Sequence, residues 1–383
     1  MPEPFVVSYE GVPNHLIGPT SDFVLPQEEM SVAALAGFKL ISFPPLTKKE
    51  ALDDQVHRLI GVNEPDTGLQ NTVLRNLIPP PLAILQHFLK RRLEGTIPIA
   101  TSITHDGRHF PLDILNIWMV LAAVHRVQGR WDKTLKWMRR QERKNGVLYD
   151  RVVNLLQNIS WGGTVQGFDS TGHCPVSMIA TYLSDDWLSD DHMHHFTELL
   201  ERRLLSDSGH MSETYVMGLW FATCLSKFDD HPDHPYLERI GLDLASGRRK
   251  RIVGMQNVSS NHWIAFAIDS CTASIAVGDS FKKPHPSFLS AASRWVERHM
   301  NCTYKQVTLP CVDQNDGFSC GILVMDAIEH YLDPEHYPLV SKPPHALGAS
   351  RMSRAIDVIT HHLDSVGSFS DAYAKIGTYQ SLS

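Results

Sequence analysis

The fold of the C-terminal half is decided by residues 262–279, which read HWIAFAIDSCTASIAVGD. Within this stretch, residues 263–268 form an unbroken apolar run, which is typical of a strand buried on both faces. Residues 274–277 form a second, shorter run of strand type, and turn-forming residues stand between the two. The pattern therefore predicts a β-hairpin.

The turn of this hairpin sets which residues face each other. With residues 269–272 as the turn, the centre of symmetry falls between Ser270 and Cys271, so that position 279 lies opposite position 262. We therefore predict that His262 and Asp279 are cross-strand neighbours. An aspartate beside an imidazole fixes the tautomer of the ring and stabilises its charged form, as in a nucleophilic triad.

A second informative stretch, residues 314–332, contains a cysteine before an apolar helix. Its apolar positions repeat at helical spacing: Ile322, Met325, Ile328 and Leu332. Cys320 is then expected at or just before the N-terminus of a buried helix, where the helix dipole and free amide groups favour a thiolate. Gly321 permits a close approach of backbone or substrate. Gln314 stands on a turn containing Gly317, where its side-chain amide and the Cys320 amide could stabilise an oxyanion.

Each of these residues also has an ordinary structural interpretation. A histidine that begins a strand is usually packed or solvated, and a cysteine before an apolar helix is usually part of the core. The order and spacing of the set favour the catalytic interpretation, because a nucleophile, a base, an orienting carboxylate and an oxyanion donor are all present.

The sequence resembles the ubiquitin-like-protein-specific (SUMO) proteases of the adenovirus-protease-like group of cysteine peptidases. Four motifs carry the resemblance in the family's order: Trp187-Leu188-Ser189-Asp190, similar to the family's Trp-Leu-x-Asp signature; His262-Trp263; Gly278-Asp279-Ser280; and Gln314 with Cys320-Gly321. They cover about half of the chain, from near residue 170 to the C-terminal helix. Ser319 departs from the family pattern, because many members have aspartate before the nucleophile.

The resemblance implies an α+β fold of the papain/adenain type, a mixed sheet packed by helices. It implies that Cys320 is the nucleophile, His262 the general base, Asp279 its orienting residue and Gln314 an oxyanion donor. The reaction would pass through a thioester and would require no metal and no cofactor.

The resemblance also implies a substrate, a ubiquitin-like protein or its conjugates cut after the C-terminal diglycine. Trp187 and Trp263 would flank a narrow tunnel for the two glycines, and Asp190 would contact a basic residue of the modifier body. Two alternatives stay open. One is a binding module that grips such a tail without cutting it. The other is a mobile-element-associated protease with a different protein substrate, since a helical, tryptophan-rich region before such a protease is also similar to fungal proteins linked to mobile elements.

We predict two domains: a mainly helical N-terminal region of unknown function over residues 1–165, and the cysteine peptidase domain over residues 166–383. Residues 1–80 have no long period and are expected to be loosely structured or mixed. Apolar periodicity predicts helices over residues 82–93, 114–124, 131–143 and 152–159. The glycine-rich residues 161–172 are the predicted linker.

Composition sets further limits. Six cysteines without a Cys-x-x-Cys pair predict mainly reduced, buried thiols. No apolar run approaches the roughly 20 residues of a membrane helix, and the first ten residues do not read as a secretory signal. We therefore expect an intracellular protein, nuclear or cytoplasmic. The net charge of −7 argues against a surface that binds nucleic acid throughout.

Three local features allow other functions. The basic stretch 131–144 could make a weak nucleic-acid contact, although a solvated helix face is the alternative. Residues 248–251, Arg-Arg-Lys-Arg, could be a nuclear-import patch or phosphate contact, but a charged strand edge is favoured. His192 and His195 lie three apart on a predicted helix and could bind a metal, although a solvated helix is favoured because no third ligand follows.

Overall fold

The computed structural model describes residues 6–20, 22–46, 51–66, 74, 76–97, 102–169, 174–206, 213–341 and 344–380, with side chains as far as residue 367. The chain divides into two compact units. The first consists of Met1–Leu135, Leu156–Thr164 and Pro175–Ser177, and the second of Lys136–Leu155, Val165–Cys174 and Met178–Ser383. Helix α5 contributes residues to both units, and the predicted domain boundary after residue 165 stays a prediction.

The first unit is built mainly from short elements. They are η1 (Asn14–Leu16), β1 (Ile17–Gly18), β2 (Leu25–Pro26), α1 (Val32–Gly37), α2 (Leu52–Leu59), β3 (Ile60–Gly61), α4 (Leu82–Leu93), β4 (Ser102–His105), β5 (Arg108–Phe110) and the first part of α5 (Ile114–Leu156). Strands β3, β4 and β5 form an antiparallel sheet, and β1 pairs in parallel with β2. The helix predicted over residues 82–93 is confirmed, although its buried face is formed by Ile84, Leu85 and Phe88 and Leu93 is exposed.

Helix α5 joins the helices predicted over residues 114–124 and 131–143, and a kink at Asn145 separates them from the segment that contains the helix predicted from residue 152. It runs from Ile114 to Leu156, and its only non-helical backbone is at Asn145 (φ −132°, ψ 38°). Gly129 does not end the helix, because one glycine costs only about 1 kcal/mol in a helix interior. Burial of Trp118, Trp131 and Met138 along its length offsets that cost.

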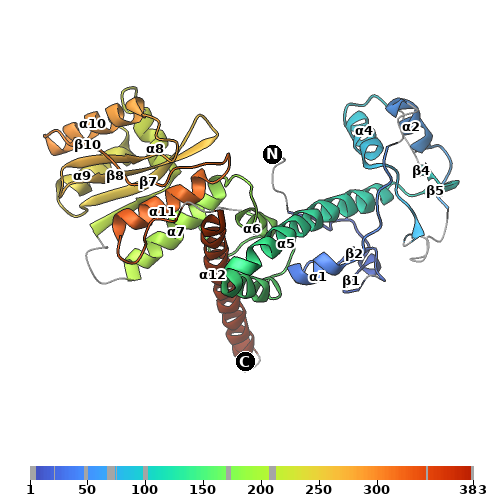
Figure 1. The fold of residues 1–383 in the computed structure, drawn as a ribbon. Helices are drawn as coiled ribbons and strands as arrows, with labels where there is room; N and C mark the ends of the chain where they lie inside the picture. Colours follow the sequence, from blue (N-terminus) through green and yellow to red (C-terminus); the bar gives the residue numbers. More distant parts are fainter. Residues whose placement is uncertain are drawn as a thin grey trace. The chain divides into compact units, whose positions relative to one another are not determined.

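The second unit contains a mixed five-stranded sheet (Figure 1). Its strands are β6 (Thr214–Met217), β7 (Arg251–Val258), β8 (His262–Asp269), β9 (Ser274–Gly278) and β10 (Lys305–Thr308), in the order β10-β9-β8-β7-β6. The central pairs β7–β8 and β8–β9 are antiparallel, and the outer pairs are parallel. All eight residues of β8 are buried, as the apolar run predicts for a central strand.

Helices cover both faces of this sheet (Figure 1). The helices of this unit are α6 (Ile179–Tyr182), which follows η2 (Val176–Met178), then α7 (Asp190–Ser206), α8 (Leu219–Ser226), α9 (Pro235–Ala245), α10 (Pro286–Met300), α11 (Cys320–Leu332) and α12 (Pro344–Gln380). Of these, α6 and α12 pack against other helices rather than on the sheet. Phe266 and Ile268 of β8 enter a core shared with α8, α9 and α10. The alternate residues Ala265 and Ala267 face the other side, where α11 packs. The predicted α+β class is therefore confirmed.

The register of the β8–β9 hairpin differs from the prediction by two residues. Asp269 pairs with Ser274 and Ala265 with Gly278, so the ladder places position 262 opposite position 281 and not opposite 279. The reason is Asp269, whose Oδ1 accepts the N–H groups of Cys271 and Thr272 and so ends the strand before the turn. A shift of two residues keeps every side chain on its face, so His262 and Asp279 still lie on one face as diagonal neighbours.

Candidate active site

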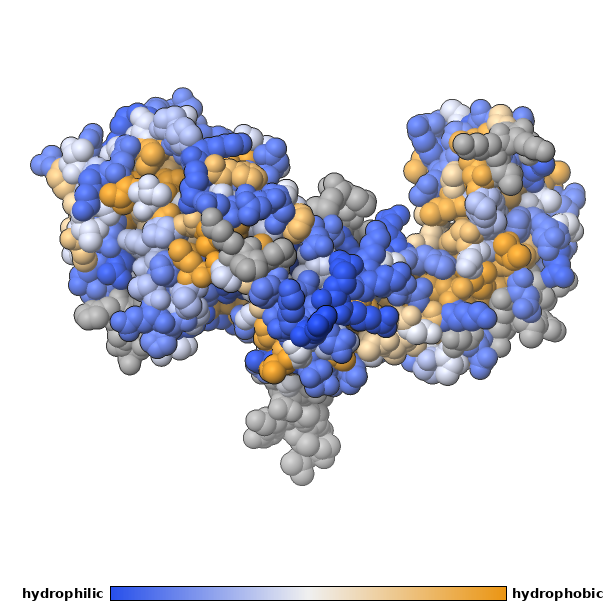
Figure 2. Space-filling view, viewed as in Figure 1, coloured by the Kyte–Doolittle hydropathy of each residue, from blue (hydrophilic) through white to orange (hydrophobic). Residues whose placement is uncertain are grey.

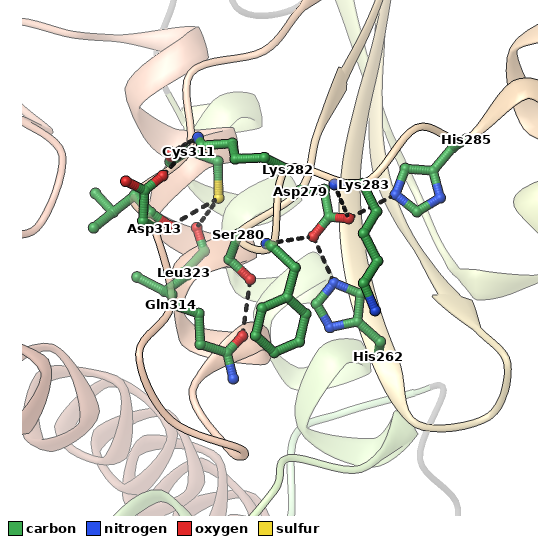
Figure 3. A network of polar contacts seen from close by, with 12 residues as sticks. His262, Asp279, Ser280, Lys282, Lys283, His285, Cys311, Asp313, Gln314 and Leu323 are labelled. Atoms are coloured by element: carbon green, nitrogen blue, oxygen red, sulfur yellow. Dashed lines mark hydrogen bonds and ion pairs between the residues drawn. The ribbon is translucent and has the colours of Figure 1, made fainter.

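The centre of the site is a buried histidine–aspartate pair. His262 is the first residue of β8, and Asp279 directly follows the last residue of β9. Nε2 of His262 lies 2.6 Å from Oδ1 of Asp279 (Figure 3). The side chains are only 10% and 3% exposed, so water does not screen the interaction. The structure thus brings together the predicted base and its orienting carboxylate.

The carboxylate of Asp279 accepts three further hydrogen bonds. The N–H of Phe281 donates to Oδ1 at 2.7 Å, while the N–H of Lys283 and Nε2 of His285 donate to Oδ2 at 3.2 and 2.8 Å. Burial is the largest influence on the pKa of Asp279 and raises it, but the bonds from Phe281, His262 and His285 outweigh it and lower the pKa overall. Asp279 is therefore ionised at neutral pH.

The protonation of His262 follows from these bonds. An ionised carboxylate only accepts, so Nε2 carries the hydrogen and Nδ1 of the neutral ring has a free lone pair. Nδ1 is buried and has no hydrogen-bond partner among the described residues. The ring of Phe281 stacks on the imidazole at 4.7 Å between centroids, with 26° between planes. Nδ1 is thus the atom of His262 that can take a proton.

Cys320 begins helix α11 and is 1% exposed. Burial raises the pKa of its thiol, while the N–H groups of Trp263 and Gly321 oppose that rise. The indole N–H of Trp187 also opposes it, although this buried group makes no hydrogen bond of normal geometry. Because Trp263 directly follows His262, its N–H places the sulfur beside the start of β8. The resting side chain is therefore a neutral thiol.

Gln314, the predicted oxyanion donor, is held on both ends of its amide. Its Oε1 accepts from Oγ of Ser280 at 2.8 Å (Figure 3). Its Nε2 donates to the carbonyl oxygen of Asp316 at 2.8 Å and to Oδ1 of the same residue at 3.2 Å. The amide is therefore directed at Asp316 in this structure, and the oxyanion role stays a prediction.

The two predicted tunnel tryptophans lie against each other. Their ring centroids are 5.6 Å apart with 18° between planes, and the indole N–H of Trp263 donates to the carbonyl of Leu188 at 2.8 Å. A peptide can pass between the two faces only if the rings separate, since stacked rings leave no room for a chain. Asp190 is exposed at the first turn of α7, where a partner can reach it.

Residues 186–339 match the family model described as the Ulp1 protease family, C-terminal catalytic domain. These residues form a Ulp1-family catalytic domain. The match includes Trp187, His262, Asp279, Gln314 and Cys320. The chain therefore carries a cysteine protease domain, that is, a hydrolase.

Several solved structures are similar to this chain. One is the C-terminal Ulp1 protease domain in complex with the yeast ortholog of SUMO, at 20% identity over 56% of this chain and 94% of that chain, with a TM-score of 0.44. Another is the Xanthomonas campestris effector XopD bound to ubiquitin, at 21% identity over 44% and 91%, with a TM-score of 0.32. A third is the Ulp1-like SUMO protease catalytic domain of Chaetomium thermophilum, at 15% identity over 46% and 73%, with a TM-score of 0.37. None of the curated proteins matches the chain.

Sequence reasoning missed residues that shape the Ulp1-family site. Asp316 accepts the N–H groups of Phe318 and Ser319 at Oδ1 and the hydroxyl of Ser319 at Oδ2. It thereby orders the loop that leads into Cys320. The signal was available in the Asn315-Asp316-Gly317 turn, because aspartate at such positions bonds the backbone two residues on.

The histidines of α7 correct the prediction of a solvated helix. His192 and His195 are each 1% exposed in the Ulp1-family domain. They pack against Tyr182, with ring centroids 4.6 and 6.5 Å from it. In the part of the chain that the structure describes, no three His, Cys, Asp or Glu side chains gather in a way that could hold a metal ion.

The basic segments do not offer a binding surface of the expected kind. Figure 2 shows a strongly hydrophilic surface over α5, but Trp131 and Trp137 are buried, so neither indole can stack on a base. Nucleic-acid contact is therefore unsupported. Three charges of residues 248–251 form ion pairs: Arg248 with Asp243, Lys250 with Glu213 and Arg251 with Asp269. Among the described helices, none combines the length and apolar character that crossing a bilayer needs.

Proposed function

We propose that the Ulp1-family domain hydrolyses the peptide or isopeptide bond after the C-terminal diglycine of a ubiquitin-like protein. A SUMO-like modifier is the first candidate. The observation that carries the proposal is the state of His262. Its Nε2 is bonded to an ionised aspartate, and its Nδ1 is buried without a hydrogen-bond partner among the described residues. The N–H of the next residue, Trp263, acts on the thiol of Cys320. These observations support the proposal that His262 is the general base and Cys320 the nucleophile.

The reaction follows from these atoms. Nδ1 of His262 takes the proton from Sγ of Cys320, and the thiolate attacks the carbonyl carbon of the last glycine. The Cys320 N–H, at the helix N-terminus, can donate to the developing oxyanion. His262 then returns its proton to the leaving amine as the C–N bond breaks, which leaves a thioester. Water, deprotonated by the same ring, hydrolyses the thioester and restores the thiol. Asp279 stays ionised throughout and stabilises the imidazolium.

The choice of substrate is supported by the surroundings of the sulfur. The motif Trp187-Leu188-Ser189-Asp190 lies beside it, because a Cβ on Gly321 would come within 3.1 Å of Leu188. Glycines are the residues that fit best beside the stacked rings of Trp187 and Trp263, because a substrate residue with a Cβ would need a wider passage. The exposed Asp190 can pair with a basic residue of the modifier body.

Modifier probes with a C-terminal electrophile test the proposal. The purified chain is incubated with SUMO, NEDD8-like and ubiquitin probes, and adducts are mapped by mass spectrometry. We expect an adduct on Cys320 with at least one probe, strongest for SUMO. Cys320→Ser should form none and should still bind the modifier, because a hydroxyl is a far poorer nucleophile in the same place.

Two outcomes would reject the proposal. Binding of a modifier without any adduct on Cys320 would identify a binding module. Absence of both binding and adducts with all probes, together with Cys320-dependent cleavage of other proteins, would identify a protease with another substrate.

A further inference from the structure

A second histidine holds the triad carboxylate. Nε2 of His285 lies 2.8 Å from Oδ2 of Asp279, on the oxygen opposite the one that His262 contacts (Figure 3). The His285 side chain is 12% exposed, close to the 10% of His262. Asp279 is thus bonded by two imidazoles, one on each oxygen.

The orientation of the carboxylate is set by its hydrogen bonds, since Phe281 donates to Oδ1 and both Lys283 and His285 donate to Oδ2. The terminal torsion of an aspartate side chain is broad, so covalent geometry alone does not fix the plane of the carboxylate. Both imidazoles must donate, because an ionised carboxylate has only acceptors. On Oδ2 the contact from His285 is the shorter one, since the N–H of Lys283 lies at 3.2 Å.

The backbone holds His285 in place. It stands between Pro284 and Pro286, and Pro286 opens helix α10. A proline restricts the residue before it and presets the first turn of a helix, so this segment has little freedom. Helix α10 in turn is anchored in the core by Phe288 and Trp295. His285 therefore links a rigid helix start to the carboxylate.

We infer that His285 is a positioning residue of the catalytic site, which holds Oδ2 of Asp279 so that Oδ1 keeps facing Nε2 of His262. The inference rests on the triad of the proposed function. It requires no contact between His285 and the substrate, and it assigns a role to the segment between β9 and α10.

Other charged groups nearby have different partners. Nζ of Lys282 bonds the carbonyl of Cys311 and pairs with Asp313 at 3.3 Å, and Nζ of Lys283 lies over the ring of Phe281. Burial raises the pKa of Cys311 to about 12, so this thiol stays neutral. His285 is thus the side chain that shares the carboxylate with His262.

The test measures the reactivity of Cys320 and needs no modifier. Iodoacetamide alkylates the full-length protein from pH 5.5 to 9, and the rate at Cys320 is followed by mass spectrometry. The variants are His285→Ala, His285→Gln, His262→Ala as a reference without the base, and His336→Ala as a matched control. His336 forms a histidine–aspartate pair of the same kind with Asp333, at 2.9 Å, in the loop after α11.

We expect His285→Ala to lower the alkylation rate at pH 7 about tenfold. A tenfold change corresponds to about 1.4 kcal/mol, which is the typical free energy of one hydrogen bond to a charged group. Its pH profile should move toward that of His262→Ala. His285→Gln should recover most of the rate, because its Nε2 reaches a similar position and donates. His336→Ala should behave like the wild type.

A wild-type rate and profile in His285→Ala would overturn the inference. So would equal losses in the Ala and Gln variants together with a lower melting temperature, because that result would indicate packing alone. If His285→Ala has the expected effect but no modifier probe reacts, the proposed substrate fails while the positioning role of His285 stands.

Discussion

At the scale of single residues, the environment of Trp187 favours a role in substrate binding. Its ring stacks on Trp263, and its buried indole N–H makes no hydrogen bond of normal geometry to the described residues, although it acts on the nearby Cys320 thiol. A buried donor without a partner costs free energy and persists where something other than stability retains it. This combination favours a role in substrate use over a role in folding.

We predict that Trp187→Ala lowers kcat/KM for a modifier substrate at least about tenfold. The free energy of unfolding should fall by less than the roughly 3 kcal/mol that truncating a core tryptophan costs, because Trp187 is only half-buried. Initial rates with a fluorogenic modifier and urea unfolding measure the two effects. Trp187→Phe keeps the stacking and removes the N–H, so it separates the ring from the donor. Unchanged cleavage by the alanine variant would remove Trp187 from the substrate path.

The residues that the sequence could predict are those whose placement depends on strand parity and helix periodicity. His262 and Asp279 come together because a two-residue error in register preserves the face of a strand. Cys320 begins a helix because the apolar spacing after it is helical. Phe281, His285 and Asp316 were missed, because their directions depend on loops after the strands end, where no period constrains a side chain.

At the scale of elements, helix α12 supports the site from outside the residues that match the family, which end at 339. Arg351 is 1% exposed and donates to three carbonyl oxygens, those of Thr181 at 3.2 Å, Asp186 at 2.9 Å and Phe318 at 3.2 Å. Asp186 precedes Trp187, and Phe318 lies two residues before Cys320. One guanidinium therefore ties together the two segments that flank the nucleophile.

We predict that Arg351→Met lowers the free energy of unfolding by about 3 kcal/mol, because it leaves buried carbonyls without donors. Burial lowers the pKa of Arg351 to about 10, so the side chain is charged at neutral pH and its loss also removes a cation from the site. Urea denaturation measures the change. Arg202→Met is the matched control, because Arg202 also donates to a carbonyl, that of Gly167, but is half exposed. Equal effects of the two substitutions would contradict the prediction.

At the scale of the whole molecule, the sequence predicted the α+β class of the second unit but not the extent of every helix. The sheet and its helices follow from local apolar patterns, as β8 and α11 show. The extent of α5 does not, because whether a helix continues past Gly129 depends on the surfaces that bury it on either side. Likewise, the burial of His192 and His195 depends on Tyr182, which packs on them from another segment.

His195 makes the stability of the second unit depend on pH. Neither of its ring nitrogens has a hydrogen-bond partner among the described residues, and Phe168 lies 4.4 Å from it between ring centroids. Burial, followed by the nearby His192, His194 and His361, lowers the pKa of His195 from 6.5 to about 3. Between pH 3 and pH 6.5, His195 is protonated in the unfolded chain but neutral in the folded chain. Stability is therefore fully present above pH 6.5 and is lost as the pH falls toward 3.

We predict that the free energy of unfolding falls by about 3 kcal/mol through this residue between pH 6.5 and pH 4. His195→Leu should flatten that part of the curve, because leucine fills the apolar site and does not titrate. Urea unfolding of both proteins at half-unit pH steps measures the slope. His336→Leu is the control: Asp333 raises the pKa of the exposed His336, so its loss should not flatten the acid slope. An unchanged slope in His195→Leu would mean that other groups cause the acid sensitivity. Protonation of His195 in the unfolded chain would then contribute nothing measurable to the free energy of unfolding.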